Sequence, residues 1–168
     1  MMKINVIKAK KEIGSQETFE FVTSAEKIDL ESEGPWVGSE IKVTGELVNN
    51  GRVLTIKGVI HATAKNQCHR CLENFITKMD ISFSEDYQEN NDVDIDEEAD
   101  LAYYNGDEID IADVVRESII LAEPLKVLCS KSCKGLCPHC GINLNTTVCS
   151  CNNDHIDPRL AVLSQLLK

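Results

Sequence analysis

Residues 129–151 read CSKSCKGLCPHCGINLNTTVCSC, and this stretch decides how the C-terminal third of the chain folds. It contains six of the eight cysteines; the other two, Cys68 and Cys71, lie upstream in the sequence CHRC. Eight thiols at such close spacing bind a metal, form disulfides or react with a substrate. The choice among these three roles decides most of what the sequence says about function.

The rest of the chain indicates a reducing compartment. No apolar run is long enough for a membrane span, and the N-terminus MMKINVIKAKKEIG lacks the apolar core of a signal peptide. We therefore expect a cytoplasmic protein without a membrane partner. Disulfides are rare in such a compartment, so the cysteine pattern favours metal binding.

The cysteines fall into four close pairs, which predicts two zinc ions with four cysteine ligands each. The pairs are Cys68 with Cys71, Cys129 with Cys133, Cys137 with Cys140, and Cys149 with Cys151. Short chain closures cost less entropy, which favours one site made by the first two pairs and a second made by the last two. The alternative, in which the pair at 68 and 71 joins the pair at 137 and 140, stays open.

A redox enzyme is the less favoured interpretation of the same residues. Cys-Pro-His-Cys at 137–140 suggests a thiol-disulfide oxidoreductase, but that chemistry needs a helix to begin there, and Gly-Ile-Asn-Leu-Asn at 141–145 is a poor helix start. His69 and His139 are interpreted as spacers, His155 as a spare ligand and His61 as structural. No P-loop, Rossmann glycine pattern or hydrolase motif is present, so we expect neither an enzyme nor a small-molecule substrate.

The pattern of apolar residues predicts an α+β fold over a single domain, residues 1–168. We expect an antiparallel β-sheet or partly open barrel with one packed helix, a cysteine-rich zinc-knuckle region and a short C-terminal helix. Residues 1–83 would form the β-rich part with CHRC at a hairpin tip, 84–108 an acidic loop, and 109–168 the helix and the zinc module. The expected strands cover residues 4–7, 18–22, 41–48, 52–64 and 75–83.

Two helices follow from periodicity and capping residues. Asp110 is the expected N-cap of the first, whose apolar positions from Ile111 to Ala122 recur at helical spacing and which Pro124 ends. Ile120 and Leu121 should widen its buried face. Asp157 and Pro158 are typical of the start of the second helix.

The negative charge is concentrated in one region. The net charge is −11, yet residues 79–115 hold 14 acidic residues and neither Lys nor Arg, so the remainder has 17 basic and 28 − 14 = 14 acidic residues, or +3. A solvated linker is the simpler interpretation of the acidic stretch. The functional interpretation is a protein-binding adaptor that holds a basic ribosomal protein or a ribonuclease.

The combination of CHRCLENF, an acidic middle, EPLKVLCSKSCKGLCPHCGINLN, a closing cysteine pair and DPRLAVLSQLL resembles the YceD family of large ribosomal RNA subunit accumulation proteins. The resemblance covers roughly residues 40–167. It implies a bacterial protein that supports the synthesis, processing or accumulation of 23S rRNA, with rRNA or the pre-50S particle as partner. Zinc knuckles that present Arg70, Lys131 and Lys134 would then contact RNA phosphates. Charge balance around the thiolates is the competing interpretation of these three cations.

Overall fold

The computed structural model describes residues 2–30, 35–36, 38–90 and 101–151. The chain divides into two compact units, which we name the sheet unit (residues 1–66 and 75–125) and the cysteine unit (residues 67–74 and 126–168). The expected C-terminal helix and His155 lie outside the described residues, and the expectation of a single domain stays a prediction.

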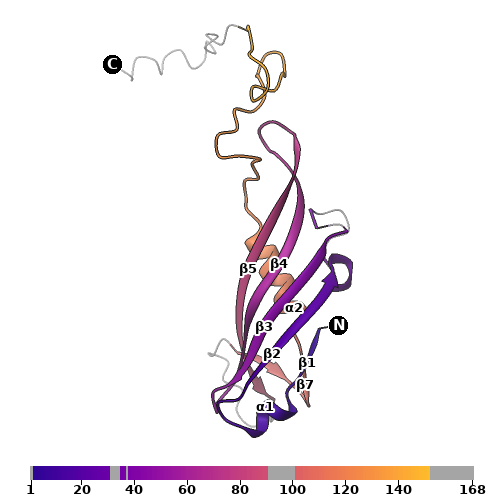
Figure 1. Ribbon diagram of the computed structural model, residues 1–168, viewed down its shortest axis with the longest axis vertical. Helices are drawn as coiled ribbons and strands as arrows, with labels where there is room; N and C mark the ends of the chain where they lie inside the picture. The colour runs from indigo at the N-terminus through magenta and orange to yellow at the C-terminus, as the bar shows by residue number, and fades with distance from the viewer. Residues whose placement is uncertain (1, 31–34, 37, 91–100, 152–168) are drawn as a thin grey trace, which may run out of the picture. The chain divides into compact units, whose positions relative to one another are not determined.

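A five-stranded sheet dominates the sheet unit, with its strands in the order β2-β3-β4-β5-β6. Figure 1 shows β2 to β5. The strands are β2 (Gln16–Ser24), β3 (Glu40–Asn49), β4 (Leu54–Gln67), β5 (Asn74–Glu89) and β6 (Ala102–Tyr104). Strands β2 to β4 pair antiparallel, whereas β6 pairs parallel with the end of β5. The predicted α+β class is therefore confirmed, with an open sheet rather than a closed barrel.

The hairpin of β3 and β4 forms where the sequence predicts it. Val43 lies opposite Ile60, and both are fully buried because apolar residues alternate along each strand. The turn between the strands is held by Asn50, whose side-chain oxygen accepts the backbone N–H groups of Arg52 and Val53 at 3.0 and 2.9 Å. Gly51 has φ +89°, a conformation that glycine adopts without steric cost.

The expectation of a loop over residues 84–108 is wrong at both ends of that segment. Strand β5 continues to Glu89, and β6 and β7 (Glu108–Asp110) form after the acidic run. The physical reason is that large side chains continue to find the core: Phe83, Tyr87 and Tyr104 are buried, while Glu85, Asp86 and Glu89 are half-buried. Residues 91–100 lie outside the described part.

The N-terminal strand is shorter than expected. Strand β1 covers Lys3–Asn5 and pairs with β7, with Ile4 opposite Ile109. Ile7, expected in that strand, instead begins the short helix α1 (Ile7–Lys11), and the Asn5 side chain accepts its N–H at 3.1 Å. The sequence pattern does not predict this helix.

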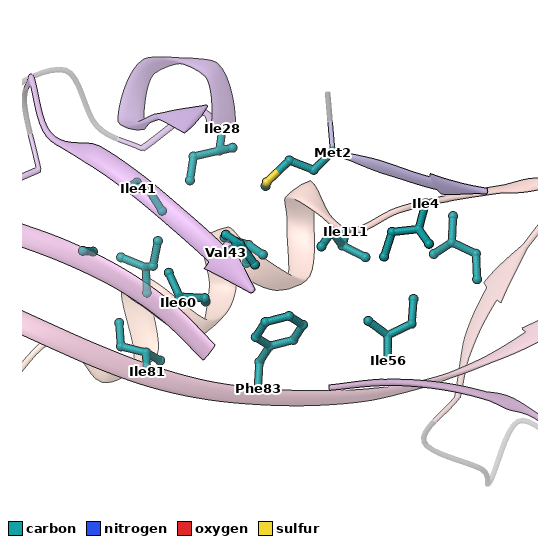
Figure 2. Packing of buried hydrophobic residues seen from close by; sticks show 14 of the residues in the cluster. Met2, Ile4, Ile28, Ile41, Val43, Ile56, Ile60, Ile81, Phe83 and Ile111 are labelled. Atoms are coloured by element: carbon teal, nitrogen blue, oxygen red, sulfur yellow. The ribbon is translucent and has the colours of Figure 1, made fainter. Parts of the chain in front are cut away.

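Helix α2 (Ala112–Ala122) lies against one face of the sheet, as its periodicity predicts (Figures 1 and 2). Asp110 stands two residues before it and accepts the N–H of Ala112 at 3.0 Å. Val115 and Ile119 are fully buried. The expected widening of the apolar face is wrong, because Ile120 and Leu121 are 53% and 84% exposed.

The core of the sheet unit lies between the sheet, β1 and α2. Figure 2 shows Phe83, Ile60 and Val43 projecting from the strands into the same interior as Ile111 at the start of α2. Burial of such side chains contributes about 1.5–3 kcal/mol each and is the main stabilising term of the unit.

Among the described residues, no helix has the length and hydropathy that crossing a membrane requires.

Candidate metal centre

Four thiols of the cysteine unit meet in a first group, which we name tetrad 1. Cys68 and Cys71 come from the loop between β4 and β5, and Cys129 and Cys133 come from the chain after α2. The loop closes on itself because the N–H of Leu72 donates to the carbonyl of Cys68 at 2.9 Å. Both sulfurs of the Cys-x2-Cys pair thereby face the same side of the turn, as in a zinc knuckle.

Backbone hydrogen bonds hold the two halves of tetrad 1 together. The N–H of His69 donates to the carbonyl of Val127 at 2.9 Å, and that of Leu136 donates to the carbonyl of Arg70 at 3.1 Å. The Arg70 guanidinium donates through Nη1 to the carbonyl of Cys133 at 2.8 Å. Gly135 packs so closely on Arg70 that a side chain there would lie 3.0 Å from the Arg70 carbonyl oxygen.

Tetrad 2 consists of the remaining thiols, those of Cys137, Cys140, Cys149 and Cys151. Its first turn has the same form as the loop of tetrad 1: the N–H of Gly141 donates to the carbonyl of Cys137 at 2.9 Å, and Gly141 has φ +73°. The N–H groups of His139 and Cys151 point to ligand sulfurs at 3.4 and 3.2 Å. The structure thus assembles the grouping that short chain closure favours.

The spacing of the sulfurs fits a tetrahedral metal ion. A zinc ion about 2.3 Å from four thiolates places neighbouring sulfurs about 3.8 Å apart. In tetrad 1 the Cys68–Cys133 and Cys71–Cys129 Sγ distances are 3.8 and 3.6 Å. In tetrad 2 the Cys140–Cys149 distance is 3.6 Å and the Cys137–Cys149 distance is 3.3 Å. These separations exceed the roughly 2.05 Å of a disulfide, and all eight cysteines are free thiols.

The thiol pKa values indicate that each tetrad needs a cation to ionise fully. Burial of Cys68 opposes its ionisation, but backbone N–H groups led by that of Cys129 outweigh burial and lower the pKa of Cys68 to about 6. Cys129 shifts in the opposite direction: the contact with Cys71, with burial and the remaining thiols, raises the pKa of Cys129 to about 12.

Tetrad 2 repeats this pattern. Backbone N–H groups of Cys140 and His139 lower the pKa of Cys137 to about 6, whereas the neighbouring thiol of Cys149 raises the pKa of Cys151 to about 12. Four thiolates within 4.8 Å of one another are stable only around a metal ion. The donor set therefore fits a metal with an affinity for sulfur, and both tetrads can hold one.

The two tetrads differ in burial. In tetrad 1 the sulfur-bearing residues are buried except for Cys129, whereas in tetrad 2 Cys137 is buried, Cys140 is exposed, and the other two are intermediate. Each tetrad uses four protein ligands and leaves no position for a substrate, which is the arrangement of a structural site.

The expected RNA-binding cations all lie in the cysteine unit, beside tetrad 1. Lys131 and Lys134 are exposed. Arg70 is also exposed, but its guanidinium already donates to the Cys133 carbonyl, so part of its hydrogen-bonding capacity serves the fold of the unit. His69 and His139, the expected spacers, are exposed. The backbone N–H of His69 donates to the carbonyl of Val127, and that of His139 points to Sγ of Cys137 in its own turn.

Sequence reasoning missed one residue that contacts tetrad 1. Asn145 donates its side-chain amide to Sγ of Cys133 at 3.3 Å. This hydrogen bond is the largest influence on the pKa of Cys133, which lies below its ordinary value. The signal in the sequence is the Asn-Leu-Asn segment at 143–145, which is part of the family resemblance.

Comparison with known proteins identifies relatives of this chain. A family model described as large ribosomal RNA subunit accumulation protein YceD matches residues 56–167. An Arabidopsis thaliana protein described as large ribosomal RNA subunit accumulation protein YCED homolog 1, chloroplastic, is 25% identical over 77% of this chain and 49% of its own length. Uncharacterized proteins of Mycobacterium tuberculosis and Bacillus subtilis are 27% and 28% identical, over 90% and 77% of this chain and 73% and 76% of their own lengths. No solved structure matches the chain significantly.

Proposed function

This chain belongs to the YceD family of large ribosomal RNA subunit accumulation proteins, and we propose that it supports 23S rRNA accumulation as a non-enzymatic, zinc-stabilised RNA-binding factor. Each tetrad would hold one zinc ion, Cys68, Cys71, Cys129 and Cys133 in one site and Cys137, Cys140, Cys149 and Cys151 in the other. Tetrahedral sulfur sites also suit iron, so metal analysis decides the identity.

A groove beside tetrad 1 is the observation that carries the RNA-binding proposal. It has a volume of about 500 Å³ and is lined by hydroxyl and amide side chains, by the ammonium group of Lys134, by the carboxylate of Glu73, and by the ligands Cys71 and Cys129. Hydroxyls, amides and lysines are the groups with which proteins contact phosphates and sugars. The described part of the cysteine unit has four Lys and Arg residues and one acidic residue, so its side-chain charge apart from the thiols is 4 − 1 = +3.

Zinc bound to thiolates would offset the positive charge of the cysteine unit. Two ions with four thiolates each add −4, so the loaded unit carries 3 − 4 = −1. Binding then depends on contacts with individual phosphates at the rim of the groove rather than on a long-range field, which the salt in a cell screens within about 8 Å. Lys131 and Lys134 are the exposed cations that we propose for these contacts.

A salt titration of binding to 23S rRNA fragments tests the proposal. Exchanging Lys131 and Lys134 for alanine should weaken binding and reduce the slope of log K against log salt by about 0.7 for each lost phosphate contact with a single strand. Lys8→Ala with Lys11→Ala, two exposed lysines of α1, is the matched control and should leave binding unchanged. An unchanged slope in the groove variant would contradict direct RNA binding there.

A cellular experiment separates this proposal from the adaptor alternative. In a strain that lacks the gene, the wild-type chain should restore 23S rRNA and the large-subunit peak of a sucrose gradient, and the groove variant should restore less. A partner held through the acidic segment would instead stay bound after ribonuclease treatment and would be lost when residues 92–100 are deleted.

A further inference from the structure

The loop of residues 141–148 connects two ligands of tetrad 2. It begins after Cys140 and ends before Cys149, and the Sγ atoms of these two cysteines are 3.6 Å apart. A metal ion in tetrad 2 therefore closes this loop at its base. Without the ion, nothing covalent or coordinate fixes the distance between its ends.

The middle of the same loop reaches back to tetrad 1. The N–H of Leu144 donates to the carbonyl of Gly135 at 2.9 Å, and Oδ1 of Asn145 accepts the N–H of Lys134 at 2.8 Å. The amide nitrogen of Asn145 then faces Sγ of Cys133 at 3.3 Å. A loop anchored on one set of ligands thus delivers a hydrogen-bond donor to a ligand of the other set.

Neighbouring contacts hold the Asn145 side chain in this orientation. Oδ1 of Asn143 accepts both the backbone N–H of Asn145, at 3.0 Å, and its Nδ2, at 2.9 Å. Asn143 in turn donates to the Glu73 carboxylate at 3.3 Å, on the loop that carries Cys71. The Asn145 amide therefore faces Lys134 with its oxygen and Cys133 with its nitrogen, because this orientation satisfies all of these partners.

We propose that Asn145 is a positioning residue for the metal of tetrad 1, and that the loop 141–148 couples the two sites so that metal at either one strengthens binding at the other. This inference depends on the proposed occupation of both tetrads by metal. It gives the Asn-Leu-Asn segment a physical role.

The coupling has two physical sources. A hydrogen bond from outside the ligand set stabilises a thiolate, and losing such a bond costs about tenfold to a hundredfold in metal affinity. Closing the loop 141–148 with metal removes much of the entropy that placing Asn145 would otherwise cost. Coupling of this kind is reciprocal, so each ion raises the affinity for the other by the same factor.

Single-site variants measure the coupling by chelator competition with zinc. Cys140→Ser leaves tetrad 1 complete and Cys71→Ser leaves tetrad 2 complete, so the two variants give the separate binding constants. We expect the binding constant of the wild-type chain for two ions to exceed the product of these constants by about fivefold or more. In the Asn145→Ala background, the ratio of the two-ion binding constant to the product of the single-site constants should fall to about one.

Further variants distinguish positioning from general damage to the fold. Asn145→Asp keeps an acceptor for Lys134 but turns an oxygen toward the Cys133 sulfur, so it should weaken tetrad 1 more than Asn145→Ala does. In cobalt-loaded protein, Asn145→Ala should shift the thiolate-to-cobalt absorption band of tetrad 1. Thr147→Ala is the control in the same loop, because the Thr147 hydroxyl faces Thr146 at 3.4 Å. It should change neither the metal affinity of tetrad 1 nor the position of its cobalt absorption band.

Each remaining outcome overturns the inference in a recognisable way. Two bound ions with no excess affinity would refute the coupling and leave the metal sites intact. Fewer than two ions in the wild-type chain would refute the proposed sites and the coupling together. If Asn145→Ala weakened tetrad 2 in the Cys71→Ser background, the residue would be structural for the whole loop rather than a positioning residue for tetrad 1.

Discussion

Gly45 of β3 lies directly opposite Gly58 of β4, on the face of the sheet that carries the core. A Cβ atom at Gly45 would meet the ring of Phe19 at 2.6 Å, and one at Gly58 would meet the ring of Phe83 at 3.0 Å. Aromatic rings from the two flanking strands thus occupy the space that side chains at the paired glycines would fill. A strand-interior glycine marks such a close approach.

The first prediction concerns this glycine pair. Gly45→Ala should lower the free energy of unfolding by about 3 kcal/mol, because the new methyl group meets a flanking ring and the carbonyl oxygen of Lys57. Denaturant unfolding followed by circular dichroism measures the change. Thr44→Ala, on the opposite face of the same strand, is the control and should cost less than about 1 kcal/mol. Equal effects of the two substitutions would contradict the packing argument.

Much of the sheet unit was predictable, because its strands bury one face. β-Branched and aromatic residues identified β2, alternating residues identified β3 and β4, and helical spacing identified the buried side of α2. The end of β5 was missed because the charged residues at 84–89 are typical of a loop, and Tyr87 is the one buried side chain there that indicates a strand. Helix α1 was missed because five residues that include Ile7 show too little periodicity to distinguish helix from strand.

In the cysteine unit, the metal ligands could be predicted from the sequence, but the residues that contact those ligands could not. Spacing groups cysteines into pairs, and chain closure favours which pairs meet, because both depend on sequence distance. The amide of Asn145 reaches Cys133 only through the path of the loop between them, which no periodic pattern encodes. The Arg70 contact with the Cys133 carbonyl joins residues 63 positions apart and was equally hidden.

A second prediction separates the structural role of Arg70 from a role in RNA binding. Arg70→Lys keeps the charge but cannot reproduce the planar donor geometry that reaches the Cys133 carbonyl. We expect it to weaken the cysteine unit by about 1 kcal/mol, measured as faster zinc loss to a chelator, with the salt dependence of RNA binding unchanged. Arg70→Ala also removes the charge, and a lower salt slope with unaltered zinc retention in that variant would instead assign Arg70 to a phosphate.

A third prediction is that metal affinity rises with pH. Near pH 7 in the metal-free chain, Cys68, with a pKa of about 6, is ionised, whereas Cys129, with a pKa of about 12, holds its proton. The pKa of Cys71 is also raised. Metal must displace these protons, so log affinity for the tetrad 1 ion should rise by at least about two per pH unit around pH 7.

Below pH 6 even the Cys68 thiolate gains a proton, and the ion should be released as pH falls further. Chelator competition in the Cys140→Ser chain between pH 6 and 8 measures the slope for tetrad 1 alone. A flat profile, after correction for protonation of the chelator, would mean that all four thiols are already ionised without metal.

The last prediction tests the grouping of the ligands by counting ions. Cys71 and Cys133 belong to tetrad 1, and Cys140 belongs to tetrad 2. Binding energy of about 10 kcal/mol or more rests on the complete ligand set, so replacing one thiolate should release that ion. Cys71→Ser and Cys133→Ser should each lose one equivalent of zinc, and the double variant should lose no second one.

Combining Cys71→Ser with Cys140→Ser should remove both ions, because one ligand is lost from each tetrad. Metal analysis of the purified, reduced proteins gives the counts directly, and native mass spectrometry shows whether a partly loaded species exists. The crossed arrangement, with Cys71 and Cys140 around one ion, makes the opposite prediction: the pair at 71 and 140 would lose one ion, and the pair at 71 and 133 would lose two. The two arrangements therefore differ in whole numbers of ions, which a modest coupling between the sites cannot imitate.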